Sequence, residues 1–138
     1  QLSQLKAKIT ILNFWASWCE ACVTEMPSLQ KLLGAYKNRG LEVVLINVED
    51  NATAIAEKTL KKLNVSIPTY QDVDQKLLEL FDVHAIPVTV ILDQDRKVLY
   101  QEAGGRDWNA PEVRSRIDEY LKGTADSKPA DSIPAQTS

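Results

Sequence analysis

Several features are scarce in this chain, and each shortage excludes a class of protein. The 138 residues include two cysteines and one histidine, so a zinc site would fall short of nitrogen and sulfur donors for the four ligands that zinc needs. No apolar run approaches the roughly 18 residues that span a bilayer, and no signal peptide opens the chain. With a net charge of −3, there is no basic surplus for nucleic acid. We therefore expect no metal, no other cofactor, no nucleic-acid partner and no membrane span within these residues.

The composition is that of an ordinary globular protein. Hydrophobic residues make up 44% of the chain and charged residues 25%, and a chain of this length can bury a core without disulfide staples. Residues 123–138 contain little to bury and predict a disordered tail. We expect one domain over residues 1–122, followed by that tail over residues 123–138.

Hydrophobic periodicity predicts alternating strands and helices. Strands are expected at 9–15, 41–48, 88–92 and 97–102, helices at 19–36, 52–63, 74–81 and 111–122, and an extended segment at 65–70. Asn109 is a candidate cap for the last helix, with Pro111 just inside it. A strand, a helix and a strand within about 40 residues form a βαβ unit, whose strands run parallel. The predicted fold class is α/β, with a central mixed sheet and helices on both faces.

The two cysteines lie three residues apart, where the first strand hands over to the first helix. Unpaired N–H groups and the helix dipole at that position stabilise a thiolate, so the pKa of Cys19 is expected to fall. Cys22 lies one turn along on nearly the same face. We predict that Cys19 is the attacking nucleophile and that Cys22 resolves the mixed disulfide, as in a thioredoxin-like redox motif.

A longer stretch around the pair resembles the thioredoxin superfamily. The segment Asn13-Phe-Trp-Ala-Ser-Trp-Cys-Glu-Ala-Cys22, followed by Glu25-Met-Pro-Ser-Leu29, is most similar to the TlpA/ResA/DsbE-type thiol–disulfide oxidoreductases. The resemblance covers nearly all of residues 5–122. It implies a thioredoxin-like fold with the βα insertion of the TlpA/ResA branch, matched here by residues 52–72.

The segment Ala85-Ile86-Pro87-Val88-Thr89 stands where that superfamily has its cis-proline loop. The resemblance therefore implies a cis Ile86–Pro87 peptide packed against the cysteine pair, with Pro87 among the catalytic residues. A cis turn leaves a backbone edge on which a partner strand can pair. We assign four residues to the substrate-binding surface: Trp18, Ile86, Glu20 and Ala21.

Two departures from the superfamily pattern bear on proton transfer and redox poise. Cytoplasmic thioredoxins have a buried Asp six residues before the first cysteine, where this chain has Asn13, and an amide cannot take a proton. The TlpA/ResA branch suggests an acid after the second strand instead, and Asp50 is the first choice and Glu49 the second. The alternative is a solvated acidic turn that caps the next helix. Glu20 opposes a Cys19 thiolate, which favours a reductant over a strong oxidant.

The resemblance implies an enzyme that reduces disulfides of extracytoplasmic proteins, with apocytochrome c among the possible substrates. Electrons would come from a membrane thiol donor of the DsbD/CcdA type. We expect a monomer that lies in the periplasm or on the outer face of the cytoplasmic membrane, with any signal or anchor outside these 138 residues. The alternative is a thioredoxin-fold copper-handling module, for which His84 is the available nitrogen ligand, although an ordinary loop residue is the simpler interpretation of His84. Peroxiredoxins place a Thr three residues before the reactive cysteine, and Ala16 at that position argues against a peroxidase.

Overall fold

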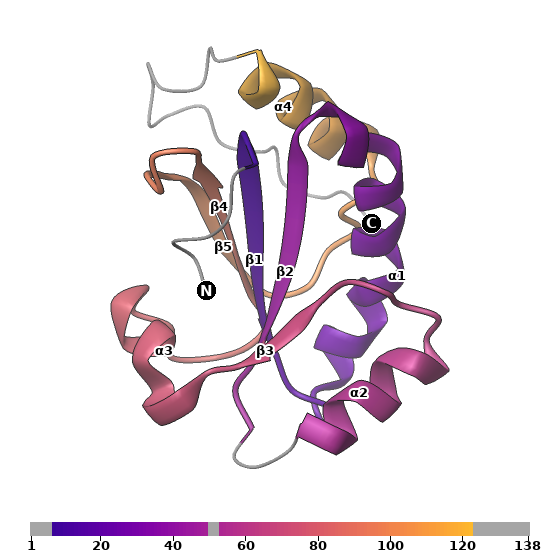
Figure 1. The fold of residues 1–138 in the computed structure, drawn as a ribbon, viewed down its shortest axis with the longest axis vertical. Helices are drawn as coiled ribbons and strands as arrows, with labels where there is room; N and C mark the ends of the chain where they lie inside the picture. Colours follow the sequence, from indigo (N-terminus) through magenta and orange to yellow (C-terminus); the bar gives the residue numbers. More distant parts are fainter. Residues whose placement is uncertain (1–6, 50–52, 123–138) are drawn as a thin grey trace.

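A five-stranded mixed sheet forms the centre of the computed structural model, which describes residues 7–49 and 53–122 (Figure 1). The strands lie in the order β3-β2-β1-β4-β5. β1 pairs parallel with β2, and β2 with β3, whereas β4 runs antiparallel to both β1 and β5. The elements are β1 (Ile9–Trp15), α1 (Glu20–Tyr36), β2 (Leu41–Asn47), α2 (Thr53–Lys62), β3 (Thr69–Gln71), α3 (Lys76–Leu80), β4 (Val88–Asp93), β5 (Val98–Ala103) and α4 (Pro111–Leu121). This confirms the predicted α/β architecture.

Alternation along β1 divides the core into two layers. Ile9, Ile11 and Trp15 lie in a cluster with buried residues of α1, α2 and α4. Leu12 and Phe14 point to the opposite face and pack with the segment around α3. Because successive side chains of a strand point to opposite faces, Asn13 shares the face of Ile11 and Trp15. The only polar residue on this face of β1 is thus directed at the helices that cover it.

The predicted elements agree with the observed ones, with small differences at three places. Ala110, not Asn109, precedes the first turn of α4, and no side chain caps that turn; the Asn109 side chain instead accepts a hydrogen bond from Arg114 Nε at 2.9 Å. In the segment predicted as one helix over 74–81, residues Val73–Gln75 form a 3₁₀ turn before α3. The extended segment predicted at 65–70 pairs as a strand only at its end, where β3 covers Thr69–Gln71. The proposed tail, 123–138, lies outside the described residues.

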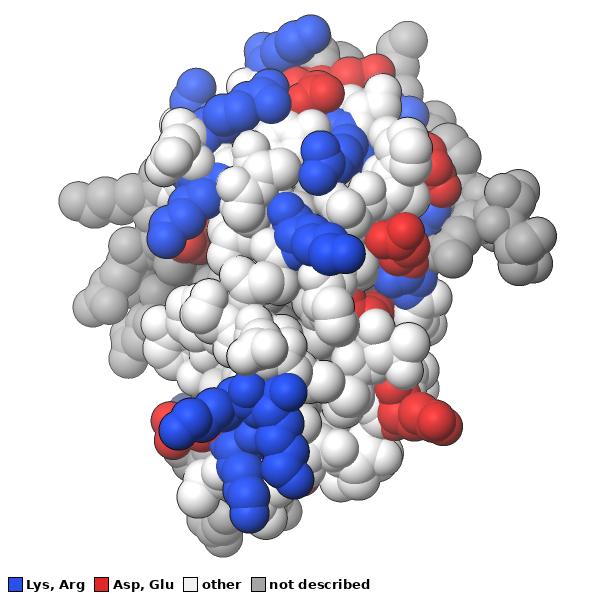
Figure 2. Space-filling view, turned by 90° about the vertical axis from the view of Figure 1, so that its right-hand side faces the viewer, with Lys and Arg blue, Asp and Glu red and all other residues white. Residues whose placement is uncertain are grey.

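Charge is unevenly spread over the surface despite the negative net charge. Basic side chains gather at the lower end of the face in Figure 2, the end at which α2 lies in Figure 1. Helix α2 carries exposed lysines at positions 58, 61 and 62. Within residues 7–49 and 53–122, no helix is both long and apolar enough to cross a membrane.

Candidate active site

The cysteine pair lies where β1 passes into α1. Cys19 is the residue that caps α1, and its Sγ accepts a hydrogen bond from the backbone N of Cys22 at 3.2 Å. The two cysteines are joined by a disulfide. The first N–H groups of a helix have no partner within the helix, so the sulfur of Cys19 satisfies one of them. The same N–H would stabilise a Cys19 thiolate after reduction.

The two sulfurs differ in exposure. Cys19 retains 8% of its surface, whereas Cys22 is completely buried. Cys22 faces the sheet, together with Met26 and Leu29 of α1. Cys19 is therefore the sulfur that a protein substrate can reach with less rearrangement of the helix.

The residues assigned to substrate binding surround this turn. Trp18 is 71% exposed, and Glu20 and Ala21 are also exposed. The Ile86–Pro87 peptide is cis, as predicted. Because Phe14 of β1 pairs with Val88 of β4, Pro87 lies level with the end of β1, from which the redox turn departs.

Glu49 lies just beyond β2, and its carboxylate is hydrogen-bonded to Ser17, two residues before Cys19. Its carboxylate accepts hydrogen bonds from the backbone N of Ser17 at 2.6 Å, from Ser17 Oγ at 2.7 Å and from Asn47 Nδ2 at 2.9 Å. Burial acts to raise the pKa of Glu49, but these hydrogen bonds outweigh it and hold the pKa below its usual value. Asp50, the first choice for the proton-transfer acid, lies outside the described residues.

A Glu49→Ala substitution is expected to loosen this attachment. It removes the acceptor for two donors of Ser17 and one of Asn47, and a hydrogen bond to a charged group is worth roughly 1.5–3 kcal/mol net. We expect the oxidised protein to lose stability in this range, measured by urea unfolding at pH 7. Glu57→Ala, at an exposed site on α2, is the matched control. An equal loss in both variants would mean that the Ser17 contacts contribute nothing.

A third carboxylate, Glu25, lies near the cysteine pair, and the sequence does not single it out as a proton-transfer acid. Glu25 lies on α1, three residues after Cys22, and is only 4% exposed. Residues three apart on a helix are neighbours on its surface. Asn13 Nδ2 donates to Glu25 Oε2 at 2.8 Å and also to Thr89 Oγ1 at 2.9 Å. The polar residue in the middle of β1 thus pairs with an acid beside the buried cysteine.

Two further donors reach Glu25 from the loop before α4. Trp108 Nε1 lies 2.8 Å from Glu25 Oε1, and the backbone N of Arg106 lies 3.4 Å from the same oxygen. Burial raises the pKa of Glu25 from 4.5 to about 6, while the hydrogen bonds from Asn13, Trp108 and Arg106 limit the rise. A carboxyl with this pKa changes protonation near neutral pH, which is the property of a group that exchanges protons with a neighbouring thiol.

Two features of the sequence indicate that Glu25 is a buried acid. Asn13 occupies the centre of a buried strand, where an amide needs a polar partner. Position 25 belongs to the buried side of α1, which carries Cys22, Met26 and Leu29. These two features predict a contact between Asn13 and Glu25 only when it is known that α1 covers the face of β1 that carries Asn13.

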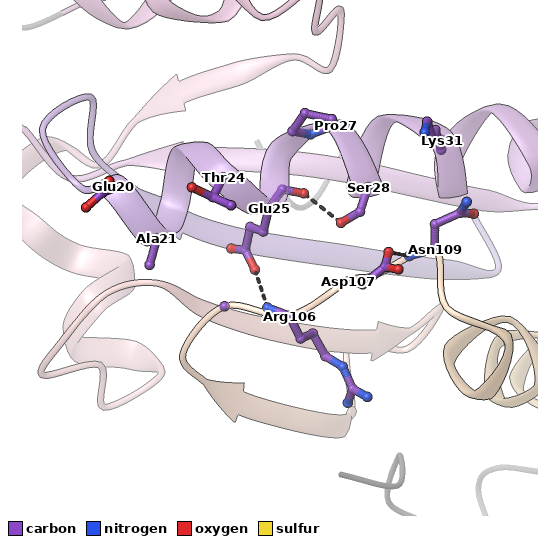
Figure 3. A pocket seen from close by; sticks show the side chains of 11 residues that line it. Glu20, Ala21, Thr24, Glu25, Pro27, Ser28, Lys31, Arg106, Asp107 and Asn109 are labelled. Atoms are coloured by element: carbon purple, nitrogen blue, oxygen red, sulfur yellow. Dashed lines mark hydrogen bonds between the residues drawn. The ribbon is translucent and has the colours of Figure 1, made fainter. Parts of the chain in front are cut away.

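A groove of about 740 Å³ runs along α1 beside the loop that connects β5 to α4. Figure 3 shows Glu20 at one end and Lys31 toward the other, with the Glu25 side chain directed at the loop. The groove therefore begins at the redox turn and passes over the buried acid. Among the described residues, no group of three or more His, Cys, Asp or Glu is arranged to hold a metal ion. His84 is exposed and contacts the carboxylate of Asp82 at 2.6 Å.

Several known proteins are similar in sequence to this chain. Residues 1–101 match the model of the AhpC/TSA family. The chain is 34% identical over 99 residues to the thiol-disulfide oxidoreductase ResA of Bacillus subtilis, over 72% of this chain and 55% of that protein. It is 29% identical over 122 residues to ResA of Bacillus anthracis, over 88% of this chain and 66% of that protein. The chain thus spans between about half and two thirds of these curated relatives.

Solved structures show the same fold. A putative thiol:disulfide interchange protein DsbE from Chlorobium tepidum is 27% identical, with a TM-score of 0.73 over 90% of this chain and 84% of that one. A putative thioredoxin from Neisseria meningitidis is 23% identical, with a TM-score of 0.76 over 88% of this chain and 80% of that one. The fold is thioredoxin-like, and α2 and β3 lie within residues 52–72, the segment that the resemblance assigns to the insertion.

Proposed function

Because the chain belongs to the AhpC/TSA family, we propose that it is a thiol–disulfide oxidoreductase that reduces disulfides of protein substrates. The observation that carries this proposal is the arrangement at the start of α1. A partly accessible Cys19 is bonded to a buried Cys22, with the buried acid Glu25 one turn further along. This arrangement supplies an attacking sulfur, a resolving sulfur and a proton acceptor.

The reaction begins with the reduced protein. The Cys19 thiolate attacks one sulfur of the substrate disulfide, which forms a Cys19–substrate bond and releases the other substrate sulfur as a thiolate. Cys22 then gives its proton to the Glu25 carboxylate, and its sulfur attacks Cys19. The Cys19–substrate bond breaks, and the second substrate sulfur leaves. Two electrons have passed to the substrate, whose two thiolates take up protons from the solvent to give a dithiol, and the protein holds the Cys19–Cys22 disulfide.

Glu25 is suited to this proton transfer because its pKa of about 6 leaves it mostly ionised at pH 7. An acid with an ordinary pKa would be a weaker base, and one with a pKa well above 7 would already carry a proton. Regeneration requires an external dithiol, for which we propose a membrane donor of the DsbD/CcdA type. We further propose an extracytoplasmic location and cysteines of apocytochrome c among the substrates, on the basis of the similarity to the ResA and DsbE proteins.

Reduction of insulin with dithiothreitol as the electron source tests the proposal. The protein should accelerate precipitation of the insulin B chain, and Cys19→Ser should reduce the rate to that of dithiothreitol alone. Protein alkylated on both reduced cysteines is a control that keeps the sequence unchanged. Full activity in Cys19→Ser would contradict the proposal. So would tight copper(I) binding by a reduced protein that does not reduce insulin, which would support the copper-handling alternative.

A further inference from the structure

The loop of residues 104–109 lies unusually close to α1 beside Glu25. A Cβ atom at Gly105 would meet the backbone oxygen of Ala21 at 3.3 Å and Glu25 Oε1 at 3.7 Å. The first distance is tighter than most contacts that a Cβ makes, so the absence of a side chain lets the loop approach the helix. The loop thus covers the carboxylate with its backbone and with one aromatic side chain.

That side chain is Trp108, which is fully buried and attached to α1 at two points. Its Nε1 donates to Glu25 Oε1 at 2.8 Å, and its backbone N donates to Ser28 Oγ at 2.9 Å. Ser28 Oγ in turn donates to the backbone oxygen of Glu25 at 2.7 Å. The indole is therefore fixed relative to the acid through both ends of the residue.

Arg106 holds the other side of the indole. Its guanidinium lies 5.5 Å from the centre of the Trp108 ring and forms ion pairs with Glu102 at 3.0 Å and with Glu112 at 3.6 Å. Figure 3 shows the guanidinium directed away from Glu25, while the backbone of the same residue faces it. Arg106 thus anchors the loop to β5 and α4 and does not pair with the acid through its charge.

The donors around Glu25 distinguish its two oxygens. An indole N–H and a backbone N–H can only donate, so Oε1, which faces Trp108 and Arg106, has no acceptor for a proton of its own. Oε2 faces Asn13, whose amide can present either Nδ2 or Oδ1. Asn13 Oδ1 is buried and accepts no hydrogen bond from the described residues. If the amide turned over, it would accept a hydrogen bond from a protonated Oε2.

We infer that Trp108 is a positioning residue for the proton transfer, which keeps Glu25 Oε1 in the unprotonated state and directs the exchanged proton to Oε2, beside Asn13. The inference rests on the proposed function, since it assigns the atom that receives the Cys22 proton. The single N–H of Trp108 favours the ionised form of Glu25. The amide of Asn13 can turn over, so it can donate to the ionised acid or accept from the protonated one. A phenylalanine at position 108 would keep an aromatic ring there but would have no N–H to hold Glu25 Oε1 in the unprotonated state.

The test compares Trp108→Phe with Trp15→Phe in the oxidised protein. Both tryptophans are fully buried, and Trp15 Nε1 donates to Thr69 Oγ1 at 3.1 Å, away from Glu25. The titration of Glu25 is followed by the 13C shift of its side-chain carboxyl. Because Trp108→Phe removes one hydrogen bond to the ionised form, we expect its inflection to rise by about one pH unit. Trp15→Phe should leave the inflection unchanged.

A second measurement needs no substitution and remains decisive if Trp108→Phe fails to fold. In 15N-labelled wild-type protein, the indole N–H of Trp108 should shift with the same inflection as Glu25, while the indole N–H of Trp15 should not. An unchanged inflection in Trp108→Phe, or an indole signal that does not follow Glu25, would overturn the inference. Neither readout involves reductase activity, so loss of the proposed function and loss of this inference are separate outcomes.

Discussion

Replacing Cys22 with serine is expected to stop the reaction at the mixed disulfide. Cys19 is the more accessible sulfur and keeps its place at the start of α1, so it still attacks a substrate disulfide. Resolution then depends on an external thiol instead of a neighbouring one. Because intramolecular attack can correspond to effective molarities far above any free thiol concentration, we expect turnover to fall by roughly 10³-fold or more. The covalent adduct should accumulate and be detected by mass spectrometry.

The paired variant Cys19→Ser separates the two roles. It leaves only the buried Cys22 and should give neither turnover nor an adduct. Both variants lose the same disulfide, so a difference between them reflects the position of the remaining sulfur and not the loss of the bond. An adduct that forms in Cys19→Ser and not in Cys22→Ser would reverse the assignment of attacker and resolver.

The second large effect is expected for Glu25→Gln, which should slow insulin reduction by about 10²-fold, the lower end of the usual contribution of a general base. Cys22 then lacks the Glu25 carboxylate as the acceptor of its proton during resolution. The glutamine should fit, since its oxygen can accept from Trp108 and its nitrogen can donate to Asn13 after the Asn13 amide turns over. The activity loss should be measured at pH 7, where the wild-type acid is mostly ionised.

The same substitution should stabilise the oxidised protein at high pH. The pKa of Glu25 is raised from 4.5 to about 6 on folding, so the folded state binds this proton more tightly than the unfolded chain. Its contribution to wild-type stability is complete below about pH 4.5 and is lost as the pH rises through about 6. Glutamine stays neutral at both pH values. The free energy of unfolding of Glu25→Gln, relative to that of the wild type, should therefore be about 2 kcal/mol higher at pH 8 than at pH 4.

Chemical denaturation of both proteins at pH 4 and pH 8 measures this difference, with Glu57→Gln at an exposed site as the matched control. The control should show neither the activity loss nor the pH-dependent gain. A Glu25→Gln protein that reduces insulin at the wild-type rate would exclude Glu25 as the proton acceptor. A stability difference that is the same at both pH values would show that the carboxyl does not titrate differently on folding.

The strand and the redox turn were predictable because their signals are local. The observed bounds of β1, Ile9 to Trp15, match the predicted strand, since an apolar run of β-branched and aromatic residues needs only its own sequence to identify it. The position of Cys19 at the start of α1 follows from the same boundary. The cis state of Ile86–Pro87 came from the resemblance, and the structure agrees with it.

The acid beside Cys22 was missed because its signal is not local. Position 13 is Asn where cytoplasmic thioredoxins have an aspartate, which suggests that another acid takes its role. The resemblance points to Glu49 and Asp50 as that acid. In the structure, the Glu49 carboxylate accepts hydrogen bonds from Ser17 and Asn47. Asn13 donates to Glu25 instead. That contact depends on which helix covers which face of the sheet, and on a loop some 80 residues away in sequence that supplies Trp108.

The edges of the sheet bear on how the protein behaves at high concentration. The outer strands are β3, which has three residues, and β5, whose pairing with β4 is interrupted by an extra residue opposite Ile91 and Leu92. Sheet-to-sheet aggregation requires a long, flat row of unpaired backbone groups, and short or bulged edge strands offer little of it. The two outer strands therefore offer other chains little backbone on which to extend the sheet into fibrils.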